Sequence, residues 1–134
     1  MEKIPCVIFD LDGTLCELGD SPNPYNHEGT ETIRVDIYKE LMKVVDKHYI
    51  DIIILTGRKR NEYGEITERW LSENDIPYNL LIMQEGNTAE KNEIYKEKEL
   101  IKLKENYNII MMYDDNPKVG EVCEKLGIPF YHCY

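Results

Sequence analysis

Two aspartates that follow an apolar strand raise the first chemical question about this sequence of 134 residues. In the stretch VIFDLDGTLC, residues 7–16, Asp10 and Asp12 occupy alternate positions of an extended segment and therefore point the same way. Their negative charges repel each other unless a positive group lies between them. The pair therefore implies a bound cation, or a reaction that requires one.

Strands that alternate with helices are expected to position these residues. Short apolar and β-branched runs are typical of buried parallel strands, and segments with helical patterns lie between them. Strands are predicted over 4–10, 50–56, 79–83, 108–114 and 128–134, and helices over about 32–48, 61–74, 90–106 and 116–126. This alternation predicts an α/β fold of three layers, in which a parallel five-stranded sheet carries helices on both faces.

More polar residues lie where the other predicted strands end. The second strand ends in LTGR, which contains Thr56 and Arg58, and the fourth ends in YDDN, which contains Asp114 and Asp115. Ligands of such folds bind beyond the carboxyl ends of the strands, so these side chains are expected in one crevice with the first acidic pair. Oxygen ligands of this kind suit a hard cation such as Mg²⁺. The predicted metal ligands are Asp10, Asp12, Asp114 and Asp115.

The chemistry that this crevice favours is phosphoryl transfer. A carboxylate beside Mg²⁺ can attack phosphorus to form an aspartyl-phosphate, and a second carboxylate can protonate the leaving oxygen and later deprotonate water. Asp10 is assigned as the nucleophile and Asp12 as the general acid and base. Thr56 and a lysine would hold the equatorial phosphoryl oxygens, over which the charge of the transition state is spread.

These motifs resemble those of the haloacid dehalogenase superfamily of Mg²⁺-dependent phosphohydrolases. The D-x-D-G-T motif of that superfamily is intact at residues 10–14, its second motif matches IIILTGR, and its paired acids match IIMMYDDN. Its third motif is a single lysine, for which Lys96 is the candidate and Lys91 the rival. The resemblance implies catalytic roles for Asp10, Asp12, Thr56 and Lys96, and substrate contacts for Gly13, Thr14, Gly57 and Arg58.

Within the superfamily, the chain looks most like the 3′-phosphatase domain of phage-type polynucleotide kinases. The matching pieces, which cover nearly the whole chain, are PY at 24–25, TGR at 56–58, T..RWL at 67–71, M.EGNT at 83–88, lysines at 91 and 96, and DD at 114–115. The resemblance implies a phosphorylated substrate that is the 3′-phosphate end of a nucleic acid. That domain usually carries arginines where this chain has Ser21 and Pro22 and where it has MQEGNTAEKN, so the catalytic set is complete and the nucleic-acid set is thinned.

The spacing of the motifs leaves no room for a cap domain. About forty residues separate Gly13 from Leu55, and a helix and a strand take up much of that length. Residues 15–32 remain, which is enough for a small flap, and the segment from Arg58 to Lys96 holds one helix and one strand. A capless site that is open to bulky substrates is therefore predicted.

Composition limits the remaining possibilities. Sixteen basic and twenty-six acidic residues give a net charge of −10, which offers no basic footprint for nucleic acid. No window approaches the roughly 20 apolar residues of a membrane span, and no secretory signal precedes the first acidic pair. The four cysteines lack paired C-x-x-C spacing, so a zinc site is not expected. One cytoplasmic domain over residues 1–134 is predicted.

Two alternatives to a polynucleotide 3′-phosphatase remain. One is a phosphatase of a mononucleotide or a sugar phosphate, in which the flap or a second copy closes the site. The other is a receiver-like signalling module, which also places paired acids, a threonine and a lysine around Mg²⁺. A receiver needs a phosphorylatable aspartate at the end of the third strand, where this chain reads NLLIMQEG. The residues therefore favour the enzyme.

Overall fold

The computed structural model describes residues 2–17, 29–86 and 90–134, in which five strands alternate with four helices. The strands are β1 (Ile4–Phe9), β2 (Asp51–Lys59), β3 (Leu80–Gln84), β4 (Tyr107–Asp114) and β5 (Phe130–His132). The helices are α1 (Val35–Val45), α2 (Arg60–Glu73), α3 (Asn92–Asn106) and α4 (Pro117–Leu126). All strand pairs are parallel, and the sheet order is β3-β2-β1-β4-β5. The predicted α/β fold class is confirmed.

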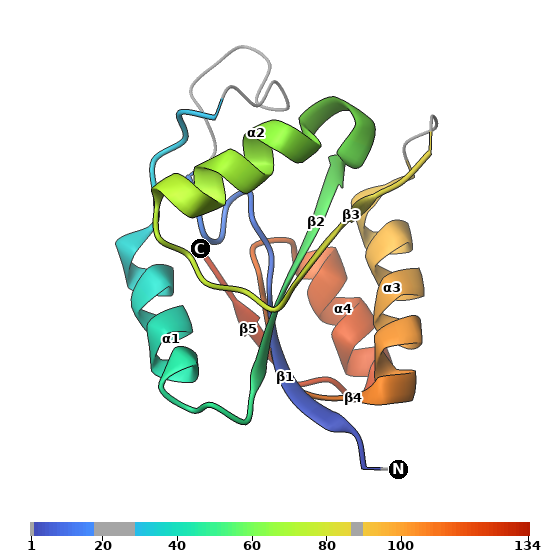
Figure 1. Cartoon of the computed structure of the whole chain (residues 1–134). Coiled ribbons are helices and arrows are strands. Elements are labelled where there is room, and N and C mark those ends of the chain that lie inside the picture. The colour runs from blue at the N-terminus through green and yellow to red at the C-terminus, as the bar shows by residue number, and fades with distance from the viewer. Residues whose placement is uncertain (1, 18–28, 87–89) are drawn as a thin grey trace.

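The central strand β1 separates two hydrophobic cores. Val7 and Phe9 point to the core beneath α1 and α2, whereas Cys6 and Ile8 point to the core beneath α3 and α4. Figure 1 shows α1 on one side of the sheet and the pair α3 and α4 on the other. Successive residues of a strand face opposite ways, so a β1 strand that is apolar at every position contributes side chains to both cores.

Several element boundaries differ from the sequence prediction. Strand β2 extends to Lys59, three residues beyond its predicted end, because Lys59 pairs with Gln84 after a register shift in the β2–β3 ladder. Residues 56–58 therefore lie on the strand itself. Helix α1 begins at Val35 instead of residue 32, because Ile33 forms an antiparallel bridge with Cys16. Strand β5 covers residues 130–132 only.

The turn between β4 and α4 is fixed by helix capping. The side chain of Asn116 accepts a hydrogen bond of 2.9 Å from the backbone N–H of Lys118, and Pro117 occupies the first helical position. Asp114 accepts a bond of 3.0 Å from the backbone N–H of Asn116. The cap thus holds the two acidic residues at the carboxyl end of β4.

Part of the sequence prediction lies outside the described residues. The predicted flap falls largely on residues 18–28, which include Ser21, Pro22 and the PY pair, and the end of the EGNT match falls on 87–89. No helix in the described ranges has both the length and the apolar character that crossing a bilayer requires.

Candidate active site

Three carboxylates meet at the carboxyl edge of the sheet. Asp10 follows β1, Asp114 ends β4, and Asp115 comes next in the chain. One oxygen atom from each lies within 4.8 Å of the others, and Asp10 and Asp114 are buried. The prediction that residues more than a hundred positions apart converge at this edge agrees with this geometry.

Lys96 lies between two of these carboxylates. Its ammonium group donates hydrogen bonds of 2.7 Å to Asp10 Oδ1 and of 2.7 Å to Asp114 Oδ2, and the side chain is fully buried. A buried ammonium ion is tolerated only when such partners offset its desolvation. Lys91 is exposed at the N-cap of α3, so the structure brings Lys96 to the acidic cluster and leaves its rival outside.

Burial and repulsion act together on the acidic cluster. Burial of Asp10, and then the charge of Asp114, raise the pKa of the Asp10 carboxyl well above its ordinary value. Burial and Asp114 likewise raise the pKa of Asp115. Burial alone would lower the pKa of Lys96, but the charges of Asp10 and Asp114 outweigh it and raise that pKa. The lysine is therefore charged, and one lysine does not neutralise three carboxylates.

Asp12 is held apart from this cluster by Arg58. The guanidinium donates from Nε to Asp12 Oδ2 at 2.9 Å and from Nη2 to Asp12 Oδ1 at 2.7 Å, a bidentate pair. The same guanidinium donates to Thr67 Oγ1 at 2.9 Å and approaches Glu31 Oε1 at 3.5 Å. Arg58 is only 5% exposed. Arg58 is thus buried and paired with Asp12 and Thr67, and the substrate contact predicted for it stays a prediction.

The remaining predicted residues shape the wall of the site. Gly13 has a φ of +83°, and a Cβ there would lie 2.1 Å from Asp115 Oδ2, so only glycine lets this carboxylate approach. Thr14 is buried and donates to Asp10 Oδ2 at 3.3 Å. The Thr56 hydroxyl is also buried and accepts from the backbone N–H of Arg58 at 3.2 Å.

Gly57 is the remaining predicted contact. A Cβ at this position would lie 2.6 Å from Asn92 Oδ1 at the start of α3, so the lack of a side chain lets α3 approach β2. This approach brings the first turn of α3, and Lys96 on its next turn, against the sheet edge.

A family model described as the polynucleotide kinase PNKP phosphatase domain matches residues 4–133. The chain belongs to this family. It is accordingly a phosphatase domain of the haloacid dehalogenase type, as the motifs predicted.

Two solved structures extend this relationship of the phosphatase domain. A chain in the structure of the Pnkp1/Rnl/Hen1 RNA repair complex is 31% identical with a TM-score of 0.81, over 98% of this chain and 44% of that one. A chain in a structure of the Pnkp1/Rnl/Hen1 complex is 33% identical with a TM-score of 0.83, and the match covers 97% of this chain and 46% of that one. The phosphatase domain thus spans less than half the length of either chain. No curated protein sequence matches it significantly.

The acidic cluster of this phosphatase domain fits a hard divalent cation. Asp10, Asp114 and Asp115 offer three oxygen ligands at one point, and burial, followed by the charge of Asp114, raises the pKa of Asp10 and of Asp115, so a bound cation would favour their ionised forms. Mg²⁺ prefers such oxygen ligands and keeps part of its water shell. Asp12 was also predicted as a ligand, but it lies outside this group of three and pairs with Arg58.

Sequence reasoning missed the residues that hold Arg58 in place. The Glu31 side chain approaches the guanidinium. The backbone carbonyl of Glu31 accepts a hydrogen bond of 2.8 Å from the Trp70 indole N–H. Thr67 and Trp70 stand three residues apart on one face of α2, and the sequence analysis placed them in the T..RWL match without assigning them a role at the site. The Thr67 hydroxyl and the Trp70 indole N–H could have indicated these contacts, because a buried hydroxyl or indole N–H requires a hydrogen-bond partner.

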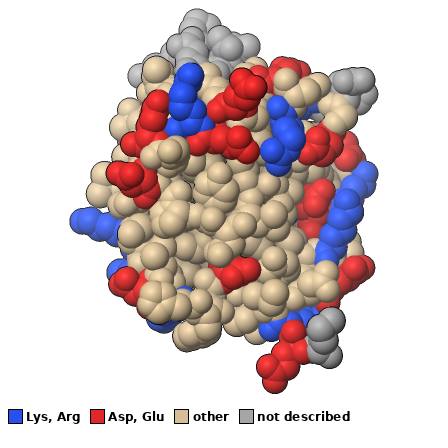
Figure 2. All heavy atoms as spheres, in the orientation of Figure 1, with Lys and Arg blue, Asp and Glu red and all other residues tan. Residues whose placement is uncertain are grey.

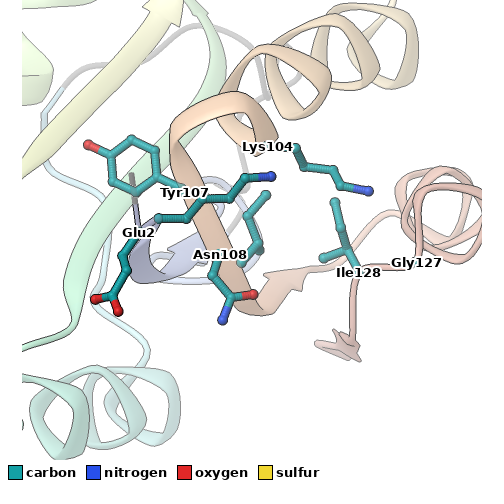
Figure 3. Close-up of a pocket in the computed structure, with 8 residues that line it drawn as sticks. Glu2, Lys104, Tyr107, Asn108, Gly127 and Ile128 are labelled. Atoms are coloured by element: carbon teal, nitrogen blue, oxygen red, sulfur yellow. The ribbon is translucent and has the colours of Figure 1, made fainter.

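Two pockets differ in their relation to the acidic cluster. One, of about 630 Å³, has Gly13 and Asp115 in its wall. The other, of about 460 Å³, is lined by residues such as Lys104, Tyr107 and Asn108 (Figure 3). Tyr107 and Asn108 begin β4, so this second pocket lies at the amino edge of the sheet, away from the catalytic edge of such folds.

Proposed function

We propose that this phosphatase domain removes the 3′-phosphate from the end of a polynucleotide, through an aspartyl-phosphate at Asp10 and with Mg²⁺ bound. The observation that carries the proposal is the different environment of the two acids in one motif. Asp10 is buried beside Lys96, whereas Asp12 is held by Arg58 with its side chain 23% exposed. Two carboxylates in such different settings suit two different roles in one reaction.

Asp10 is the group that attacks phosphorus. Lys96 and Thr14 orient its two oxygens, at 2.7 Å and 3.3 Å, so the nucleophile has little freedom to rotate. When bound, Mg²⁺ would polarise the phosphoryl group and offset the charge of the cluster. As the bond from phosphorus to Asp10 forms, the bond from phosphorus to the 3′ oxygen breaks.

Asp12 moves the protons. It gives its proton to the departing 3′ oxygen, and then takes a proton from the water that attacks the phosphoenzyme and releases phosphate from Asp10. The bidentate contact with Arg58 fixes the direction of this carboxylate. Glu31 shares the guanidinium at 3.5 Å, so the charge of Arg58 is divided between two carboxylates.

The substrate assignment rests on the family and on the structural relatives. The matching family model describes a polynucleotide kinase phosphatase domain, and both similar chains come from Pnkp1/Rnl/Hen1 structures, one of them described as an RNA repair complex. On the face in Figure 2, the described basic side chains stand among acidic ones and form no continuous strip. With a net charge of −10, few phosphate contacts and a shallow salt dependence are expected.

A panel of phosphate esters tests this function at one ionic strength with Mg²⁺. It compares a 3′-phosphorylated oligonucleotide with a 5′-phosphorylated one, a nucleoside 3′-monophosphate, a sugar phosphate and an aryl phosphate. We expect the highest kcat/KM for the 3′-phosphorylated oligonucleotide. If a sugar phosphate or a free mononucleotide exceeds it by about tenfold or more, the polynucleotide assignment is wrong and only the phosphatase chemistry survives.

A further inference from the structure

The pocket of about 630 Å³ borders the acidic cluster on the side of β5. Gly13 and Asp115, which form part of the candidate site, also form part of the pocket wall. Arg34, His132 and Tyr134 complete much of the remaining wall. A group attached to a phosphate at Asp10 therefore has an open recess beside it.

A row of aromatic rings leads along β5 into this pocket. Phe130, His132 and Tyr134 alternate along the strand and its extension, with ring centroids 6.2 Å and 4.3 Å apart. His132 is fixed at the site because its Nε2 lies 3.0 Å from the backbone oxygen of Asp115. The Tyr134 ring is tilted by 40° to the His132 ring, and Tyr134 is 94% exposed. The Tyr134 ring thus lies beside His132 and is open to solvent.

The charges of the pocket indicate which part of a substrate it suits. Arg34 donates hydrogen bonds of 2.9 Å to the backbone oxygen of Gly13 and of 2.9 Å to Asp36 Oδ2. The positive charge of Arg34 is therefore already paired with groups of the pocket wall. Asp36, Glu17 and Asp115 add three carboxylates to the same wall. A second phosphate would meet repulsion there, whereas an uncharged base and a sugar would not.

We propose that this pocket binds the nucleoside that carries the scissile 3′-phosphate, with its base stacked on Tyr134. The proposal rests on the proposed function, since it places the leaving group of that reaction. Stacking on an aromatic ring accepts every base, because each base has a π-face. It would let a strongly acidic domain hold a polynucleotide end while it makes few phosphate contacts.

The test compares a 3′-phosphorylated oligonucleotide with the same oligonucleotide ending in an abasic 3′-phosphate. The measured quantity is the ratio of the two kcat/KM values. We expect Tyr134→Ala to lower this ratio about tenfold, mainly through KM, and Tyr134→Phe to retain it. Tyr49→Ala is the matched control, because Tyr49 is 70% exposed and lies between α1 and β2, and the ratio should not change. A nucleoside 3′-monophosphate should show the same Tyr134→Ala loss, which identifies the nucleoside as the ligand.

A binding measurement separates stacking from a general structural effect. In an Asp10→Asn background, an oligonucleotide with 2-aminopurine at its 3′-phosphorylated end should be quenched on binding, and Tyr134→Ala should abolish the quenching. Equal losses of kcat/KM on base-containing and abasic substrates in Tyr134→Ala would contradict base stacking in this pocket. An unchanged ratio of the two kcat/KM values together with unchanged quenching would contradict it as well. If the wild-type domain prefers 3′-phosphorylated oligonucleotides but Tyr134→Ala has no effect, only the pocket fails. If it prefers sugar phosphates, the proposed function itself fails.

Discussion

Replacing Arg58 distinguishes a positioning role from a substrate contact. The side chain is 5% exposed and donates two hydrogen bonds to Asp12 and one to Thr67. Removing one member of a buried ion pair costs about 3–5 kcal/mol, because the remaining charge stays buried without its partner. Since the Asp12 side chain is 23% exposed and water reaches it, we expect Arg58→Met to lower the free energy of unfolding by about 3 kcal/mol, the lower end of that range.

Urea unfolding in EDTA measures this loss. With a slope of about 1–3 kcal/mol/M, a loss of about 3 kcal/mol moves the midpoint by about 1–3 M. A double-mutant cycle of Arg58→Met with Asp12→Asn should give a coupling energy of about 1 kcal/mol or more. Arg60→Met is the matched control: its side chain is 38% exposed and pairs with Glu85 at the surface, so we expect a loss below about 1 kcal/mol.

The opposite pattern would refute a positioning role for Arg58. That pattern is an unchanged urea midpoint for Arg58→Met, additive effects with Asp12→Asn, and a raised KM confined to oligonucleotide substrates. It would mean that the guanidinium leaves Asp12 and meets the substrate in solution.

Three further predictions concern the acidic cluster. Mg²⁺ at about 100 times its Kd should stabilise the domain by about 2.7 kcal/mol, which corresponds to a rise in melting temperature of about 10 °C. Asp114→Asn should remove most of this rise. Equal rises in the wild-type domain and the variant would contradict the metal site. Burial and the charge of Asp114 raise the pKa of Asp10 in the folded domain above its ordinary value of 3.8. The stability that protonated Asp10 contributes is therefore fully present below pH 3.8, and it is lost as pH rises through the raised pKa of the folded domain. In EDTA the melting temperature should therefore fall more steeply with rising pH in wild type than in Asp10→Asn. Parallel curves for the two proteins would contradict a raised pKa of Asp10. Gly13→Ala should weaken Mg²⁺ binding by displacing Asp115, whereas Gly127→Ala, with a similar φ of +74° but no heavy atom within 4 Å of the new Cβ, should cost stability only.

The alternation of elements was predictable because each strand is a short apolar run. Strands that are buried on both faces need apolar residues at nearly every position, and Ile52, Ile53, Ile54 and Leu55 supply them in β2. The end of β2 was not predictable from that pattern. Its extension to Lys59 depends on pairing with β3 across a register shift, which is a property of two strands and not of one.

The convergence of the acidic residues was predictable from fold topology, and their individual partners were not. The rule that parallel strands present ligands at their carboxyl ends brought Asp10 and Asp114 together. The choice between Lys91 and Lys96 required the direction of α3 against the sheet, because both lysines lie in one charged stretch. The pairing of Arg58 with Asp12 required the direction of one side chain on β2 and of another in the turn that follows β1, which residue spacing does not contain.

Covalent capture of phosphate on Asp10 is the decisive test of the proposed aspartyl-phosphate. The Asp12→Asn variant is mixed with an aryl phosphate and Mg²⁺, quenched in acid and analysed by peptide mass spectrometry, since a good leaving group needs no acid and the missing base slows hydrolysis. We expect a phosphoryl group on the peptide that contains Asp10, and none when Asp10→Asn is added. Turnover by the wild-type domain with no phosphoenzyme in either protein, or a phosphoryl group on another residue, would contradict the mechanism.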